Sequence, residues 1–294
     1  MKLISFQDGR MPGIGVLDDA EGAVIDLSAA GLSSDMTSFI ELGSEGLQRA
    51  METCMDPVAV LDPEDIYLTA PIPTPRRNIF CVGRNYHDHA KEFHESGFDA
   101  SEKDKVIPDH PMIFTKATTS VIGPGEDLDL SLDPTGTTDY EGELGVIIGP
   151  GGRGIAKDEA YNHVYGYTII NDMTARTLQH QHKQWFIGKS LDGYCPMGPC
   201  LVTADEIGDV AKLQLTTTVN GEKRQDAVVA DLIFDIPTLI ETISAGITLL
   251  PGDIIATGTP VGVGIGFDPP VFLKSGDTVA VTVSGIGTLE TPVI

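Results

Sequence analysis

Three acidic side chains alternate along one segment of the chain, and that segment runs directly into an apolar stretch. Residues 138–143 read TDYEGE and residues 144–148 read LGVII. Alternate residues of a β-strand share a face, so Asp139, Glu141 and Glu143 would project to the same side. Burying three carboxylates together is costly unless their charge is compensated. The segment therefore predicts either a divalent cation held inside a sheet or a solvated face on an edge strand.

A further acidic residue follows the next strand pattern. Val164–Ile170 has the pattern of a strand, which ends at Asn171 and Asp172. Functional residues are common where a strand gives way to a helix, although Asp172 or Thr174 could equally cap the helix expected over residues 174–182. An all-oxygen ligand set suits Mg²⁺, Mn²⁺ or Ca²⁺ rather than zinc, and a few carboxylates plus water suit Mg²⁺ especially.

The composition is that of a folded, turn-rich chain. Apolar residues make up 41% and charged residues 21%, a globular mixture, and 33 glycines with 19 prolines predict many turns and short strands. The net charge of −24 repels phosphate backbones and anionic lipids, so we expect neither nucleic acid nor membrane as a partner. The first residues lack a signal-peptide pattern, and the four cysteines fit no strong metal or redox motif. We therefore expect a cytoplasmic protein.

Prolines at positions 71, 73 and 75 divide the chain. They predict a small N-terminal α/β domain over residues 1–70, a Pro-rich linker over 71–78 and a larger domain over 79–294. In the larger domain, Asn220-Gly221 predicts a hairpin turn, and Asp235 is expected to cap a helix that stops at Gly246. The fold class predicted is mixed α+β and rich in strands.

Six stretches of the chain, in the same order, resemble the fumarylacetoacetate hydrolase family. They are residues 82–92, 114–116, 139–144, 167–176, 188–199 and 257–264. The resemblance, which points to a bacterial acylpyruvase or fumarylpyruvate hydrolase-like member, implies a β-roll or barrel catalytic domain, usually in a homodimer. It also implies a Mg²⁺ or Mn²⁺ ion held by Glu141, Glu143 and Asp172.

The same resemblance assigns roles to other residues. Lys189 matches the family's active-site lysine, and His89 with Glu92 matches a His–Glu pair on a flexible lid, which we expect over Tyr86–Glu102. Two acids, Asp139 and Asp192, are expected to lie behind the metal ligands. The residues expected to contact substrate are Arg84, Tyr86, Lys116, Gln179 and Thr259. Of these, Arg84 departs from the family pattern, and either it or Lys116 could grip a distal carboxylate.

These residues can be assembled into one reaction. A 2-oxo acid with a second carbonyl could chelate Mg²⁺, which as a Lewis acid stabilises the enolate formed when the C3–C4 bond breaks. His89, oriented by Glu92, would activate water, unless the two form only a surface pair or His87 is the base. Lys189 would neutralise developing negative charge.

The sequence therefore predicts a metal-dependent hydrolase that cleaves a carbon–carbon bond of an acylpyruvate, such as fumarylpyruvate, in aromatic catabolism. Three other reactions of the family remain as alternatives, because all can proceed through the same enolate: oxaloacetate decarboxylation, 2-hydroxydienoate isomerisation and sugar-acid dehydration. A non-catalytic metal-binding protein is the remaining alternative. It is disfavoured because holding a metal requires neither Lys189 nor the His89–Glu92 pair.

Overall fold

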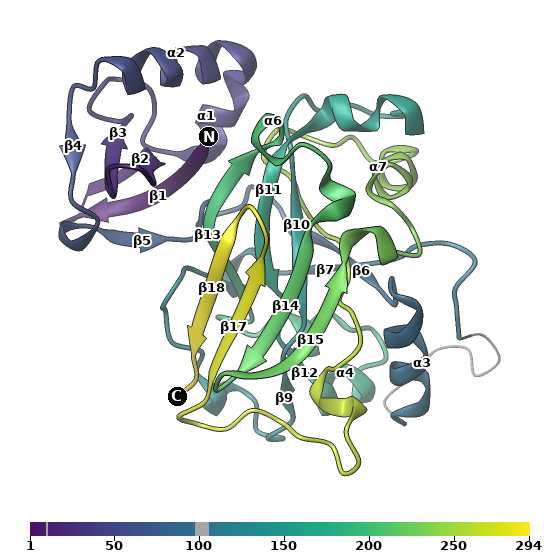
Figure 1. Ribbon diagram of the computed structural model, residues 1–294. Helices are drawn as coiled ribbons and strands as arrows, with labels where there is room; N and C mark the ends of the chain where they lie inside the picture. The colour runs from purple at the N-terminus through teal and green to yellow at the C-terminus, as the bar shows by residue number, and fades with distance from the viewer. Residues whose placement is uncertain (10, 98–105) are drawn as a thin grey trace.

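One long twisted sheet runs through the protein and joins the N-terminal strands to the strands at the centre of the molecule (Figure 1). The computed structural model describes residues 1–9, 11–97 and 106–294. In spatial order the sheet consists of β4 (Val60–Leu61), β3 (Ala23–Asp26), β2 (Met11–Asp18), β1 (Lys2–Asp8), β13 (Cys195–Thr203), β11 (Val164–Asn171), β10 (Gly142–Ile148), β16 (Ile254–Ala256), β6 (Ile79–Gly83) and β7 (Met112–Lys116). Two short strands lie off this path, β5 (Tyr67–Thr69) beside β1 and β8 (Val121–Ile122) beside β13.

This sheet is open, which corrects the expectation of a barrel. Over the residues that the structure describes, its path ends at β4 on one side and at β7 on the other. The reason lies in the N-terminal strands, because β1 pairs with β13 and extends the sheet outward instead of letting it close on β7. The broader prediction of a strand-rich, mixed α+β fold is confirmed.

A second sheet of four strands packs against the first (Figure 1). Its order is β15 (Glu222–Val228), β14 (Gln214–Val219), β17 (Thr278–Val283) and β18 (Gly287–Pro292). The predicted hairpin turn is present between β14 and β15, with Asn220 and Gly221 at φ 52° and 78°, the left-handed values that this turn requires. The larger hydrophobic cluster takes side chains from both sheets, including Val146 and Val281, so the core lies between them.

The helices are short and lie around the sheets. They are α1 (Met36–Glu41), α2 (Gly43–Met55), α3 (His87–Glu95), α4 (Arg176–Gln181), α5 (Phe186–Lys189), α6 (Ala204–Ile207) and α7 (Ile236–Ser244). The 3-10 turns are η1 (Pro63–Asp65), η2 (Thr118–Ser120), η3 (Leu130–Leu132), η4 (Lys157–His163), η5 (Val210–Lys212), η6 (Val229–Asp231) and η7 (Gly264–Gly266). Asp235 caps α7 by accepting from the Thr238 amide, as predicted, but the helix ends at Ser244, before Gly246. Within the described ranges, every helix is too short or too polar to cross a membrane.

The N-terminal residues form a unit that shares its sheet and core with the rest of the chain. Helices α1 and α2 lie over β1–β3 at one side of the molecule (Figure 1). Lys2 and Leu3 pair with Val202 and Leu201 of β13, and one hydrophobic cluster contains Leu3 as well as residues of β11 and β13. The expected domain boundaries at residues 70 and 78 stay a prediction.

Candidate metal centre and active-site pocket

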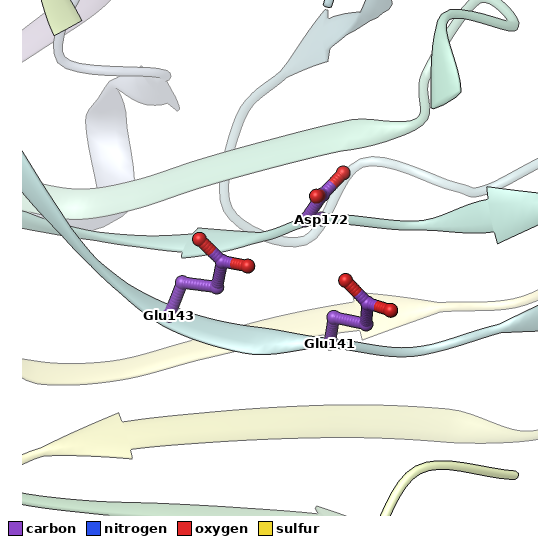
Figure 2. A group of neighbouring side chains, drawn as sticks. All are labelled: Glu141, Glu143 and Asp172. Carbon is purple, nitrogen blue, oxygen red and sulfur yellow. The ribbon is translucent and has the colours of Figure 1, made fainter. Parts of the chain in front are cut away.

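Three buried carboxylates converge between two central strands. Glu141 precedes β10, Glu143 lies on β10 and Asp172 follows β11, which pairs antiparallel with β10. Figure 2 shows the two glutamates on the same side of one strand, with Asp172 beside them on the next. One carboxylate oxygen from each lies within 4.8 Å of the others, and at most 5% of each residue is exposed. The sequence prediction thus named three residues that the fold does bring together.

The simple alternation that suggested this cluster does not hold over the whole segment. The strand breaks at Tyr140 and Glu141, because β9 (Thr138–Asp139) turns away to pair with β12 (Thr174–Ala175) while β10 pairs with β11. Asp139 therefore faces other partners, and Asp172 takes the third place in the cluster. The solvated edge-strand alternative fails as well, because β10 lies between β11 and β16 and is buried along its length.

Two lysines contact Asp172, one at each carboxylate oxygen. The Lys116 ammonium lies 2.5 Å from Asp172 Oδ1 and also donates to the carbonyl of Met173 at 3.0 Å. The Lys189 ammonium lies 2.7 Å from Asp172 Oδ2 and 2.7 Å from Glu141 Oε2. Both lysines are almost fully buried, so these contacts are made away from bulk water and are correspondingly strong.

An arginine connects Asp139 to the cluster. One guanidinium nitrogen of Arg176 lies 2.9 Å from Asp139 Oδ2 and 2.7 Å from Glu141 Oε1. Asp139 also accepts hydrogen bonds from the backbone amides of Gly264 at 2.6 Å and Ile265 at 3.2 Å. Asp139 thus fixes Arg176, which in turn fixes Glu141, so Asp139 is connected to the acidic cluster through one intervening side chain.

The charges of the cluster do not balance. Burial and the neighbouring charges of Asp172 and Glu141 raise the pKa of Glu143 well above its ordinary value. Burial acts on Glu141 in the same direction, but Lys189 and Arg176 outweigh it and lower the pKa of Glu141 to about 2. Lys116, Arg176 and Lys189 form ion pairs with Asp139, Glu141 and Asp172, and no ion pair to Glu143 is found among the described residues. A carboxylate without a cationic partner, next to two others whose oxygens converge with its own, fits a hard divalent cation.

A small pocket, with a cavity volume of about 20 Å³, opens over the carboxylates. It is lined by Val82, Gly83, Arg84, His89, Phe93, Phe114, Glu141, Glu143, Arg176, Gln179, Trp185, Lys189 and Thr259. The sequence did not predict the aromatic wall of this pocket. The ring of Trp185 packs edge-on against the rings of Phe93 and Phe114, with ring centroids 5.7 Å and 5.2 Å apart. Trp185, the one tryptophan of the sequence, lies four residues before Lys189, and that position was the only available hint.

The His–Glu pair lies at the edge of this pocket. His89 Nδ1 is 3.1 Å from Glu92 Oε2, and the other Glu92 oxygen accepts a hydrogen bond from the Gly262 amide at 3.0 Å. His89 is 4% exposed and lines the pocket, whereas His87 is exposed on the same helix and lies outside it. The geometry therefore favours His89 over His87 as a base.

Helix α3, on the expected lid, is anchored more firmly than its polarity suggested. Phe93 is 2% exposed and packs with Val263 and Ile265 in a small hydrophobic cluster. The expected lid extended over Tyr86–Glu102, and residues 98–102 of it lie outside the described residues.

Of the other residues expected at the site, some line this pocket and others do not. Arg84 lines the pocket in a left-handed conformation, φ 58°, and its guanidinium donates to the carbonyl of Val106. Tyr86 and Lys116 do not line this pocket, and Tyr86 lines a neighbouring one. Asp192 is exposed in the turn before β13, which does not fit its expected place behind the ligands.

Two residues that line the pocket, Gln179 and Thr259, form hydrogen bonds with neighbouring residues. Gln179 Oε1 accepts from Arg176 at 3.4 Å, and Thr259 donates its hydroxyl hydrogen to the carbonyl of Gly142 at 2.9 Å. Thr259 also accepts from Gln225 at 2.7 Å. Both side chains are thus held at the pocket wall by hydrogen bonds within the protein.

The three converging carboxylates of this pocket form a group that could hold a metal ion. Residues 78–294 match the family model described as "Fumarylacetoacetate (FAA) hydrolase C-terminal". The chain belongs to the fumarylacetoacetate hydrolase family.

Relatives in this family carry several activities. The chain is 54% identical over 226 residues to oxaloacetate tautomerase YisK of Bacillus subtilis. The aligned region covers 77% of this chain and 72% of that protein. A fumarylacetoacetate hydrolase structure from Exiguobacterium antarcticum has TM-score 0.84 and 40% identity, covering 100% and 99% of the two chains. Maleylpyruvate hydrolase from Sphingobium sp. SYK-6, solved with manganese(II) and pyruvate, has TM-score 0.80 and 30% identity with the same coverage.

Proposed function

We propose that this protein is a divalent-metal-dependent oxaloacetate tautomerase, which interconverts the keto and enol forms of a short 2-oxo diacid. One observation carries the proposal: a histidine paired with a glutamate and a buried lysine line the same small pocket above three carboxylates. The identity of 54% to a tautomerase of oxaloacetate supports it.

Glu141, Glu143 and Asp172 would hold the ion, for which we propose Mg²⁺ with Mn²⁺ as the alternative. When bound, the ion supplies Lewis acidity that withdraws electrons from an adjacent carbonyl. The maleylpyruvate hydrolase structure is a complex with manganese(II) and pyruvate, which supports a divalent ion and a 2-oxo acid as ligands of this protein.

The side chains of the pocket divide the remaining work. With its Nδ1–H directed at Glu92, His89 presents a bare Nε2 that can remove a proton from C3 of the substrate. The C–H electron pair then forms the C2–C3 double bond while the C2=O π pair moves onto the oxygen. The proton taken up by His89 passes through water to that oxygen, which returns the histidine to its neutral form. Lys189 stabilises negative charge on that oxygen as it develops. Gln179 and Thr259 would orient the substrate, and Arg84 would bind the distal carboxylate.

Lys116 has a different part in this proposal from the one that the sequence suggested. Its ammonium is engaged by Asp172 and by the carbonyl of Met173, behind the pocket. We therefore assign it the orientation of Asp172 and leave the distal carboxylate to Arg84.

Hydrolysis of an acylpyruvate is the second candidate. The His89–Glu92 pair could activate a water molecule instead of removing a carbon-bound proton, and a maleylpyruvate hydrolase shares the fold at 30% identity. The two reactions differ in whether the histidine removes a proton from carbon or from water, and the arrangement of the site is compatible with both. We also retain a homodimer and a cytoplasmic location as proposals, the former testable by light scattering.

The test is a comparison of three reactions with Mg²⁺ or Mn²⁺: loss of enol absorbance from oxaloacetate, pyruvate release from oxaloacetate, and cleavage of fumarylpyruvate. We expect the first to be the fastest, to vanish with EDTA, and to survive in His87→Ala but not in His89→Ala. The exposed His87 on the same helix is the matched control. Faster cleavage of fumarylpyruvate would favour the hydrolase, and no acceleration of tautomerisation would exclude the proposal.

A further inference from the structure

Lys189 binds the oxygens that a metal ion would need. Its ammonium has two hydrogen-bond partners, Glu141 Oε2 and Asp172 Oδ2, each at 2.7 Å. Both partners belong to the cluster of three carboxylates, and the ammonium is fully buried with them. The lysine therefore bridges two of the three carboxylates proposed as ligands, in the way that a cation bridges its ligands.

The other two cations of the cluster are held by groups outside it. Lys116 contacts Asp172 through Oδ1 and is fixed a second time by the carbonyl of Met173. Arg176 contacts Glu141 through Oε1 and is fixed by the buried Asp139. If Lys116 moved away from the cluster it would lose the carbonyl of Met173, and if Arg176 moved it would lose Asp139. Lys189 has no such second anchor among its hydrogen bonds in the described residues, so it is the cation that can move.

All oxygens of Glu141 and Asp172 are thus engaged by cationic groups. A carboxylate oxygen can accept more than one contact, but an ammonium and a divalent ion on the same pair of oxygens would repel each other strongly in a buried site. Relief requires one of the two to withdraw. The lysine is attached to the pocket wall at the end of α5, with its ammonium 5.1 Å above the ring of Phe114, and the cavity of about 20 Å³ beside it has room for a group the size of an ammonium.

We propose that a divalent ion and the Lys189 ammonium compete for the oxygens of Glu141 and Asp172, so that metal binding turns the ammonium away from Asp172 into the pocket. The inference rests on the metal site of the proposed function. It adds an order of assembly: the lysine stabilises the acidic cluster before the metal binds, and reaches its place beside the substrate only afterwards.

The first experiment compares two variants by calorimetric titration with Mg²⁺, without substrate. Lys189→Met and Lys116→Met each remove one buried positive charge beside Asp172, so they share any purely electrostatic gain. Competition predicts that the dissociation constant falls at least tenfold in Lys189→Met and distinctly less in Lys116→Met. Equal gains in the two variants, or no gain in Lys189→Met, would overturn the proposal.

The second experiment does not depend on either variant folding. In a crystal structure of the wild-type protein with Mn²⁺, Lys189 Nζ should lie more than about 4 Å from Asp172 Oδ2, beyond ion-pair distance. Retention of both lysine contacts beside a bound ion would refute competition. Neither experiment measures turnover, so a protein that binds Mn²⁺ but does not act on oxaloacetate would contradict the proposed reaction and leave this inference intact.

Discussion

Glu92 on α3 accepts a hydrogen bond from the backbone amide of Gly262 at 3.0 Å, which fastens the helix of His89 to the loop of Thr259. The second oxygen of the same carboxylate lies 3.1 Å from His89. Gly266 makes the arrangement possible, because a Cβ atom there would lie 1.9 Å from Glu92 Oε1. The orientation of the histidine therefore depends on backbone that carries no catalytic side chain.

Gly266→Ala should displace the Glu92 carboxylate and disorient His89 without touching the metal ligands. We expect kcat for oxaloacetate tautomerisation to fall at least about tenfold, part of the ~10²–10⁴ that a general base contributes, with Mg²⁺ affinity unchanged. Steady-state kinetics and calorimetry would measure both. Gly246→Ala is the matched control, because a Cβ at Gly246 meets nothing within 4 Å. Equal losses in the two variants would contradict the role of Gly266.

Local sequence signals predicted local structure well. The Asn220-Gly221 turn and the Asp235 cap depend on the conformations and hydrogen bonds of a few adjacent residues, and both are present. The continuous strand expected over residues 138–148 is interrupted, because β9 pairs with β12 from a distant part of the chain. The expected helix over 174–182 loses its first two residues to the same pairing. Long-range pairing of this kind leaves no periodic trace in either segment.

The same contrast between local signals and long-range contacts holds for the site. Spacing suggested a carboxylate group with Asp139 in it and Asp172 as a further acid. The family resemblance selected Glu141, Glu143 and Asp172, the three that the fold brings together. Spacing could not show that Lys116 lies against Asp172, since 56 residues separate them, nor that Trp185 walls the pocket. Asp192 illustrates the opposite limit: it lies within a family-like stretch, yet its side chain is exposed.

Removal of the histidine itself should be more damaging than its displacement. His89→Ala should lower kcat by ~10²–10⁴, the usual contribution of a general base, because no other base replaces Nε2. Glu92→Gln should cost less, since glutamine can still form a hydrogen bond in that place. Both variants should bind Mg²⁺ as the wild type does, since neither residue belongs to the acidic cluster. Full activity in His89→Ala would remove this residue from the reaction.

The cysteines should be chemically quiet in the folded protein. Burial raises the pKa of the Cys195 thiol to about 12 and that of Cys200 to about 11, and it raises the pKa of Cys81 well above its ordinary value. The reactive thiolate is therefore scarce at pH 8. Half-buried Cys54 is expected to be the first to react with a disulfide reagent, and all four should react after denaturation. Rapid labelling of Cys195 in the native protein would show that the core opens.

Asp139→Ala should destabilise the protein strongly, because it leaves Arg176 without one of its two buried carboxylate partners. Breaking a buried ion pair from one side costs about 3–5 kcal/mol. Denaturant unfolding would measure the loss, with Glu222→Ala as the control: Glu222 pairs with Arg224 at the surface, where such pairs contribute ~1 kcal/mol or less. Similar losses in the two variants would mean that Asp139 does not fix the cluster.

Glu143 is the ligand candidate whose charge is least compensated. Of its two oxygens, Oε2 accepts from the Gly258 amide at 2.8 Å, whereas Glu141 and Asp172 are both held by lysine. Its truncation should therefore remove an oxygen ligand and relieve like-charge repulsion at the same time. Glu143→Ala is expected to fold at least as stably as the wild type without metal, to bind Mg²⁺ far more weakly, and to lose turnover. The wild type treated with EDTA should lose activity and regain it with Mg²⁺, whereas the variant should not. If Glu143→Ala retained full activity and its metal after EDTA treatment, the metal site would have to lie elsewhere.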